Sequence, residues 1–297
     1  MFTEPVIFAA LRLGTYAALL ALVGATGLAM RLSADLGEHS KTARPTAVRL
    51  AVSAAVALTL FRLAGLYAQT WLFFGSDDGV GFETLRVIAF ETGWGAGWRV
   101  QFAAATFALA GALLVRKGVA AGWPALGVGA LIAAGSQALT GHAVEGGWLD
   151  LTVFSQSLHV VGAAVWIGSL GAIFAVIVRR NSDPALTAFV IERFSPLALT
   201  AAATLAISGV VTSFTYLAAP ADLLTSVYGR VLGAKILGAV VVASIGYHNW
   251  RRIKPRLQDP GAPADLRRAV AAELAVALIV LVLTAFLVAL PLPAWGM

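Results

Sequence analysis

The chain of 297 residues has no cysteine, three methionines and little charge. The lack of cysteine excludes disulfides, iron–sulfur clusters, thiolate metal sites and thiol catalysis. Charged residues make up 12% and hydrophobic residues 59% of the chain, whereas soluble domains average about 25% charged and about 45–50% apolar residues. The composition therefore predicts an integral membrane protein.

Long apolar runs recur along the whole chain, and a transmembrane helix needs about 20 such residues. Eight runs qualify: 6–29, 50–74, 99–115, 124–142, 154–178, 196–219, 229–250 and 269–290. We expect an all-α integral membrane protein with eight transmembrane helices in a single membrane domain. Its first four-helix half covers 1–150 and its second half 151–297. The periodicity of 82–90 predicts a short helix on the membrane surface.

Basic residues are distributed unevenly between the two sides of the expected bundle. The connections 30–49, 116–117, 179–195 and 251–268 hold fifteen Lys and Arg, whereas the opposite connections and the termini hold Arg86 alone. Because basic loops stay in the cytoplasm, we expect both termini in the periplasm of a bacterium and a multi-pass protein in its inner membrane. The same placement explains the net charge of +6 without a nucleic-acid partner.

A faint internal repeat relates the two halves. The segment before the third expected helix resembles the one before the seventh when Gly95 is aligned with Gly229, and this alignment pairs Gln101 with Lys235. Both segments enter the membrane from the same side. The sequence therefore predicts two parallel four-helix repeats.

Two histidines occupy neighbouring expected helices. His142 ends the fourth helix and His159 lies near the start of the fifth, and their short connection predicts antiparallel neighbours. Both side chains would then lie near the outer face, with Gln156 and Trp166 as supporting residues. Histidine is the commonest metal ligand and an axial ligand of haem. The alternative is that His142 is an interfacial residue and His159 a hydrogen-bonded packing residue.

Small and polar residues continue from His159 along one helical face. Gly162, Trp166 and Ser169 follow it at helical spacing. Small residues on such a face admit another helix or a flat cofactor. His248, at the inner end of the seventh expected helix, is typical of an interface anchor.

Arg62 lies near the middle of the second expected helix, where a charge is costly and usually functional. Tyr67 and Gln69 predict a polar stripe beside it that faces the bundle interior, whereas Arg12 is shallow enough to extend outward. No carboxylate is expected at mid-depth: Glu4, Glu145 and Asp150 are predicted outside, and Glu273 is predicted near the inner surface. Arg62 then requires backbone carbonyls or a ligand anion, such as a haem propionate. The same absence argues against a carboxylate-based proton antiporter.

Several segments together resemble the CopD copper-resistance membrane protein family. They are Gly141-His-Ala, Leu158-His159, Trp166-Ile-Gly-Ser-Leu170, Arg193-Phe-Ser-Pro-Leu-Ala, Ser208-Gly-Val-Val and Tyr228-Gly-Arg-Val-Leu-Gly-Ala-Lys235. The resemblance implies copper passage across the inner membrane, beside a periplasmic copper-binding partner protein. It also implies that His142 and His159 lie on the copper route, and that Lys235 is a family position without an assigned role.

The scarcity of sulfur limits what the resemblance implies. Copper(I) prefers thiolate and thioether ligands, and three methionines cannot form a ladder across a bilayer. Imidazoles can hold copper(II), or copper(I) between two nitrogens, so we expect inward copper transport with a histidine site on the periplasmic side. The family also distantly resembles membrane b-type cytochromes. The alternative is therefore a quinol-linked haem oxidoreductase, such as a cupric reductase, with His142 and His159 on haem and Arg62 on a propionate.

The predicted orientation can be tested with single cysteines, because the chain contains none of its own. We expect an impermeant thiol reagent to label Ser76→Cys in intact cells and to spare Ser182→Cys until the membrane is opened. The reverse labelling pattern would mean that the orientation is inverted.

Overall fold

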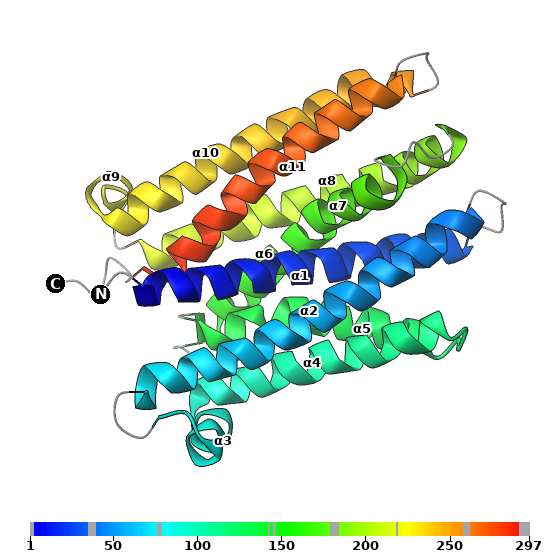
Figure 1. The fold of residues 1–297 in the computed structure, drawn as a ribbon. Coiled ribbons are helices and arrows are strands. Elements are labelled where there is room, and N and C mark those ends of the chain that lie inside the picture. The colour runs from blue at the N-terminus through cyan, green and yellow to red at the C-terminus, as the bar shows by residue number, and fades with distance from the viewer. Residues whose placement is uncertain are drawn as a thin grey trace.

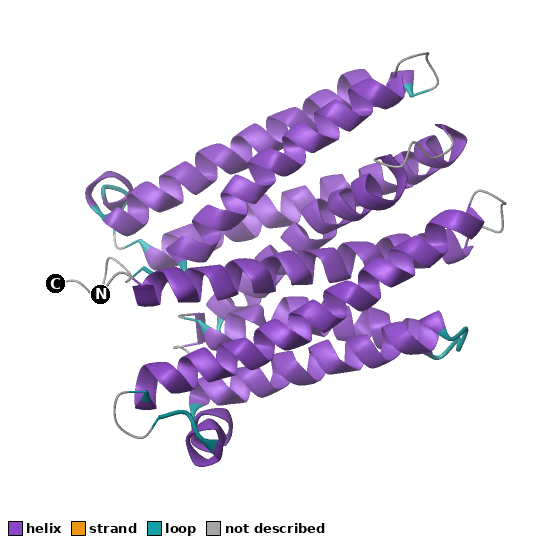
Figure 2. Ribbon diagram, viewed as in Figure 1, coloured by secondary structure: helices purple, strands orange, loops and turns teal. Residues whose placement is uncertain are grey.

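The computed structural model describes residues 3–34, 40–75, 79–141, 143–144, 147–178, 184–217, 219–257 and 262–290. These residues form helices and turns, and the described ranges contain no strand (Figure 2). The α-helices are α1 (Thr3–Ala34), α2 (Ser40–Phe74), α3 (Phe82–Glu91), α4 (Gly93–Arg116), α5 (Gly122–Gly135), α6 (Leu151–Ala163), α7 (Ser169–Ile173), α8 (Pro184–Tyr216), α9 (Asp222–Thr225), α10 (Val227–His248) and α11 (Ala262–Leu287). The other helices are the 3₁₀ segments η1 (Ser136–Thr140) and η6 (Lys254–Arg256) and the π segments η3 (Ala164–Gly168), η4 (Phe174–Val178) and η5 (Asn249–Ile253).

The prediction of an all-helical membrane protein is confirmed, with seven helical stretches among the described residues long and apolar enough to cross a bilayer. These stretches are Val6–Ser33, Ala43–Phe74, Gly93–Arg116, Leu151–Val178, Pro184–Tyr216, Val227–Arg256 and Ala264–Leu287. The expected helix 124–142 differs from them. There α5 has 14 residues, and the chain then tightens into the five-residue 3₁₀ helix η1.

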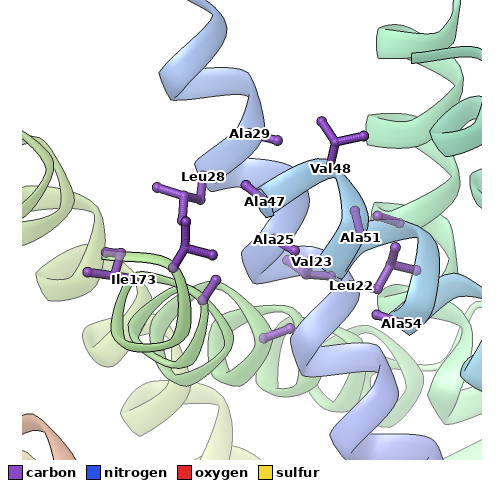
Figure 3. Close-up of a cluster of buried hydrophobic side chains, with 14 of the residues drawn as sticks. Leu22, Val23, Ala25, Leu28, Ala29, Ala47, Val48, Ala51, Ala54 and Ile173 are labelled. Atoms are coloured by element: carbon purple, nitrogen blue, oxygen red, sulfur yellow. The ribbon is translucent and has the colours of Figure 1, made fainter. Parts of the chain in front are cut away.

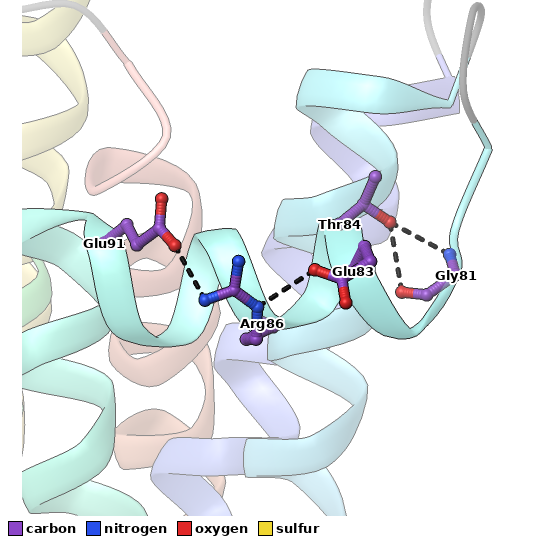
Figure 4. A network of polar contacts seen from close by, with 5 residues as sticks. All are labelled: Gly81, Glu83, Thr84, Arg86 and Glu91. Carbon is purple, nitrogen blue, oxygen red and sulfur yellow. Dashed lines mark hydrogen bonds and ion pairs between the residues drawn. The ribbon is translucent and has the colours of Figure 1, made fainter.

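The short helix predicted over 82–90 is confirmed as α3, which lies beside the start of α4 (Figure 1). The Gly81 amide donates to Thr84 Oγ1 at 2.9 Å where the helix begins (Figure 4). Arg86 pairs with Glu83 and with Glu91, each at 2.9 Å. The hydrogen bond and charge of Glu83, with the charge of Glu91, raise the pKa of Arg86.

The helices α4 and α10 begin in the same way, each directly after a short helix. Thr92 Oγ1 accepts from the Gly95 amide, and Ser226 Oγ accepts from the Gly229 amide, both at 2.9 Å. A Cβ added at Gly95 would lie 2.1 Å from a carbonyl oxygen of α3, and one at Gly229 would lie 1.9 Å from a carbonyl oxygen of α9. The two segments paired by the sequence alignment therefore share a capped, glycine-dependent start.

Alanine is the commonest residue in the largest cluster of buried side chains. Leu22 and Ala25 on α1 lie against Ala51 and Ala54 on α2, and Ile173 of α7 contributes to the same buried cluster (Figure 3). Alanine and glycine at such contacts let helix backbones approach closely. Dispersion between tightly packed backbones can therefore hold these helices together in lipid.

The helix α1 joins the two halves through a direct backbone contact. It runs between the α2–α4 pair and the helices of the second half (Figure 1). A Cβ added at Gly24 would lie 1.9 Å from the Gly168 carbonyl oxygen, and a Cβ at Gly168 would lie 2.2 Å from the Leu20 carbonyl oxygen. Glycine at 24 and 168 is therefore a steric requirement of this crossing.

The predicted single face of His159, Gly162, Trp166 and Ser169 is interrupted by the π helix η3, which breaks the α-helical spacing. A π turn adds a residue and changes the direction of the side chains that follow it. Gly162 lies against α8, Trp166 hydrogen-bonds Glu273 on α11, and the Ser169 backbone lies against α1.

The crossing makes a prediction for protein stability. We expect Gly24→Ala to lower the free energy of unfolding by about 1–3 kcal/mol, because a methyl group there must push the two backbones apart. Gly27→Ala is the matched control on the same helix, since a Cβ at Gly27 meets no atom within 4 Å. Equilibrium unfolding in a detergent titration measures the free energy of unfolding of both variants. Equal values for Gly24→Ala and Gly27→Ala would contradict the close backbone contact at Gly24.

Candidate functional site

His159 is held by one ring nitrogen. Its Nδ1 lies 3.1 Å from the Leu205 carbonyl oxygen and 3.3 Å from Ser208 Oγ, both on α8. When Nδ1 carries the proton and donates it to the carbonyl, Nε2 keeps a lone pair. This is the usual arrangement of an imidazole that binds a metal, because the second nitrogen sets the tautomer and ring direction. Among the described residues, none hydrogen-bonds Nε2.

The close approach of α6 and α8 positions the imidazole. A Cβ at Gly162 would lie 3.0 Å from the Ala201 carbonyl oxygen, and a Cβ at Gly209 would lie 3.0 Å from His159 Cε1. Glycine at 209 therefore leaves room for the ring. The small residue at 162 accommodates the backbone of α8.

Lys235 on α10 lies close enough to His159 for its charge to act on the imidazole. The polar cluster itself comes from two helices of the second half, with His159 on α6 and Ser208 on α8. Gln156, one turn before His159, is half-buried, and Trp166 hydrogen-bonds Glu273 on α11.

His142 lies outside the described residues, so its approach to His159 stays a prediction. The described ranges contain no group of three or more His, Cys, Asp or Glu that could hold a metal ion.

Arg62 is the centre of a second polar cluster, in the first half. Its guanidinium donates to Gln101 Oε1 on α4 and to Gln137 Oε1 on η1, the latter at 2.8 Å. Gln101 is 1% exposed, and its Nε2 donates to the Ser136 carbonyl at 2.8 Å and to Thr140 Oγ1 at 3.1 Å. Neutral amides therefore accept the hydrogen bonds of a half-buried cation.

Two residues that the sequence analysis considered with Arg62 do not lie where they were predicted. Tyr67 is 54% exposed, so the expected interior stripe does not include it. Arg12 does not extend outward, because its Nη1 is buried and has no hydrogen-bond partner among the described residues. The charges of Arg12 and Arg62 both act on Tyr16 of α1.

Sequence reasoning missed the partners of Arg62. Gln101 and Gln137 are uncharged and far apart in the chain, so no local pattern links them to it. The sequence feature that could have identified them is the rarity of amide side chains in apolar helices. A polar side chain within the membrane needs a partner inside the protein, so each such amide is a candidate partner of Arg62.

A double-mutant cycle tests the Arg62 cluster. We expect Gln101→Leu and Arg62→Leu each to destabilise the protein, and the double variant to lose less than their sum by about 0.5–3 kcal/mol. The reason is that removing one partner leaves the other buried and unsatisfied. Detergent unfolding of the four proteins measures the coupling, and strictly additive losses would contradict the hydrogen bond.

Comparison with known proteins shows which family the chain belongs to. Residues 1–151 match the model described as copper resistance protein D-like, N-terminal domain, and residues 188–287 match the model of copper resistance protein D. Copper transport protein CutJ of Bacillus subtilis (strain 168) is 27% identical over 143 residues, which cover 48% of this chain and 26% of that relative. The match thus spans about a quarter of the relative's length, and no solved structure matches the chain. Since one model covers more than half of the sequence, the chain belongs to the copper resistance protein D family.

Proposed function

We propose that this protein carries copper inward through a bacterial inner membrane, and that His159 and His142 bind the ion on the periplasmic side. Membership of a copper-resistance family, and similarity to a relative named copper transport protein, support copper as the substrate. The geometry of His159 carries the proposal within this chain. Its Nδ1 is engaged by α8, which leaves Nε2 for a metal.

The same geometry supports a simple sequence of events. Copper delivered at the outer face meets a neutral imidazole whose direction is already set, so little rotamer freedom is lost on binding. The few nitrogen ligands suit copper(II), or copper(I) between two imidazoles. A site with few ligands also releases its ion readily, as transport requires.

The finer topology belongs to this proposal. We place both termini in the periplasm and count α5 with η1 as an eighth crossing. At the usual rises per residue, their 14 and five residues extend about 30 Å, which matches the hydrocarbon thickness. The matching starts of α4 and α10 support two parallel four-helix repeats, with halves at 1–150 and 151–297.

A partner is also part of the proposal. A periplasmic copper-binding protein would deliver the ion at the outer face, where the connections carry little positive charge. A low density of basic residues there reduces repulsion of an arriving cation.

One observation supports the alternative function, a quinol-linked haem oxidoreductase. Arg62 has neutral amide partners, and its charge suits a propionate. The glycines at 162 and 168 argue in the other direction, because helix backbones and not a macrocycle fill the space beside them. We therefore favour copper transport.

Metal content and the visible spectrum test the site together. We expect His159→Ala and His142→Ala to lose bound copper, measured by mass spectrometry of the purified protein, because each removes a nitrogen ligand. His248→Ala is the matched control, since His248 is exposed at the end of α10. A copper protein lacks an intense Soret band, whereas a haem protein has one that the same variants lose or shift. Unchanged copper content and copper tolerance in both variants would mean that the two histidines are structural.

A further inference from the structure

A buried carboxylate lies in the second half, at Glu273 on α11. Its side chain belongs to a residue that is 3% exposed. It follows the start of the span Ala264–Leu287 by nine residues, which places it about 14 Å along the helix. The sequence predicts Glu273 near the inner surface, and the structure encloses its side chain between neighbouring helices.

The partners of Glu273 are neutral. Asn249 Nδ2 donates to Glu273 Oε2 at 2.8 Å, and the Trp166 indole also hydrogen-bonds the carboxylate. A Cβ at Gly246 would lie 3.0 Å from Glu273 Oε1, so glycine leaves room for the carboxylate. In the described part of the chain no cation pairs with it. Ionised carboxylates in such places are costly and mark ion or proton pathways.

Several titratable groups lie on α11 and on the elements around it. The elements packed against α11 are α1, α7, η4, α10 and η5. The titratable residues with described side chains on them and on α11 are Arg12, Tyr16, Arg31, Tyr228, Arg230, Lys235, Tyr247, His248, Arg251, Arg252, Asp265, Arg267 and Arg268. None of these is an ion-pair partner of Glu273 among the described contacts, which leaves its charge to the Asn249 amide and the Trp166 indole.

The Asn249 side chain can serve both protonation states of Glu273. Its Oδ1 is buried without a hydrogen-bond partner among the described residues. In the observed direction Nδ2 donates to a carboxylate. After a half-turn of the amide, Oδ1 accepts from the O–H of a carboxylic acid. The pair therefore offers a hydrogen bond to Glu273 with and without its proton.

This carboxylate cluster is connected to the candidate copper site through shared helices. Trp166 follows His159 on the span Leu151–Val178, and Lys235 and Asn249 lie on the span Val227–Arg256. A movement of either span thus reaches both clusters.

We propose that Glu273, with Asn249 and Trp166, forms a proton-binding site within the membrane, and that copper passage is coupled to the uptake and release of a proton there. The coupling rests on the proposed copper transport, whereas proton binding itself does not. The carboxylate takes up one proton from water to become a carboxylic acid and returns it to water later in the cycle.

Infrared titration of the purified protein tests proton binding directly. We expect the carbonyl band of a protonated carboxylic acid that disappears as the pH rises, because deprotonation turns the acid into a carboxylate. Glu273→Gln should abolish this band, and Glu192→Gln, an exposed carboxylate on α8, should keep it. Asn249→Leu retains the acid but removes its amide partner, so the band should shift. An identical band in wild type and Glu273→Gln at every pH would overturn the site.

Copper flux into proteoliposomes under an imposed pH gradient tests the coupling. Wild type and Glu192→Gln should respond to the gradient, and Glu273→Gln should carry copper without responding. A full response in Glu273→Gln would overturn the coupling. If wild type carries no more copper than empty liposomes, the transport proposal fails, and the infrared titration alone decides whether Glu273 binds a proton.

Discussion

The backbone contact between α1 and the π helix at Ala164–Gly168 determines how the rest of the protein is arranged. Gly24 and Gly168 let the two helices touch without intervening side chains, so dispersion between backbones replaces the hydrophobic force that lipid removes. The contact joins the first half to the second. Trp166, within the π helix, hydrogen-bonds Glu273 on α11, whereas His159, before it, lies against α8. The same span thus carries a candidate metal ligand and a hydrogen-bond partner of a buried carboxylate.

The two halves provide partners for their buried polar side chains with different residues. A polar side chain inside a bilayer must find its partner within the protein, and each half does this with side chains from several helices. In the first half, Gln101 and a second amide hold Arg62. In the second half, α8 holds His159, and Lys235 acts on it from α10. Gln101 and Lys235 are the positions that the repeat alignment pairs, so an amide that accepts a hydrogen bond from Arg62 stands opposite an amine whose charge acts on His159.

The sequence predicted much of the fold and part of the site. Apolar runs identified the long helices, and local periodicity identified α3, because both signals depend on neighbours in the chain. The importance of Arg62 was also predictable, since an isolated charge in an apolar run stands out. Its partners and the surroundings of Glu273 were not, because they combine residues from distant helices. The π helix escaped prediction as well, since its sequence, Ala-Val-Trp-Ile-Gly, is compatible with an ordinary α-helix.

By itself the sequence determined that the chain is a helical membrane protein, which helices are long, and which few polar residues lie in them. Composition and hydropathy act residue by residue, so they need no knowledge of the partner helix. Only the tertiary structure decided which polar groups meet: the His159 imidazole with α8, Arg62 with two amides, and Glu273 with Asn249 and Trp166. The physical reason is that the rotation and close approach of two helices depend on which glycines lie at their contact. A glycine matters in this way only when another helix packs against it, which local sequence does not show.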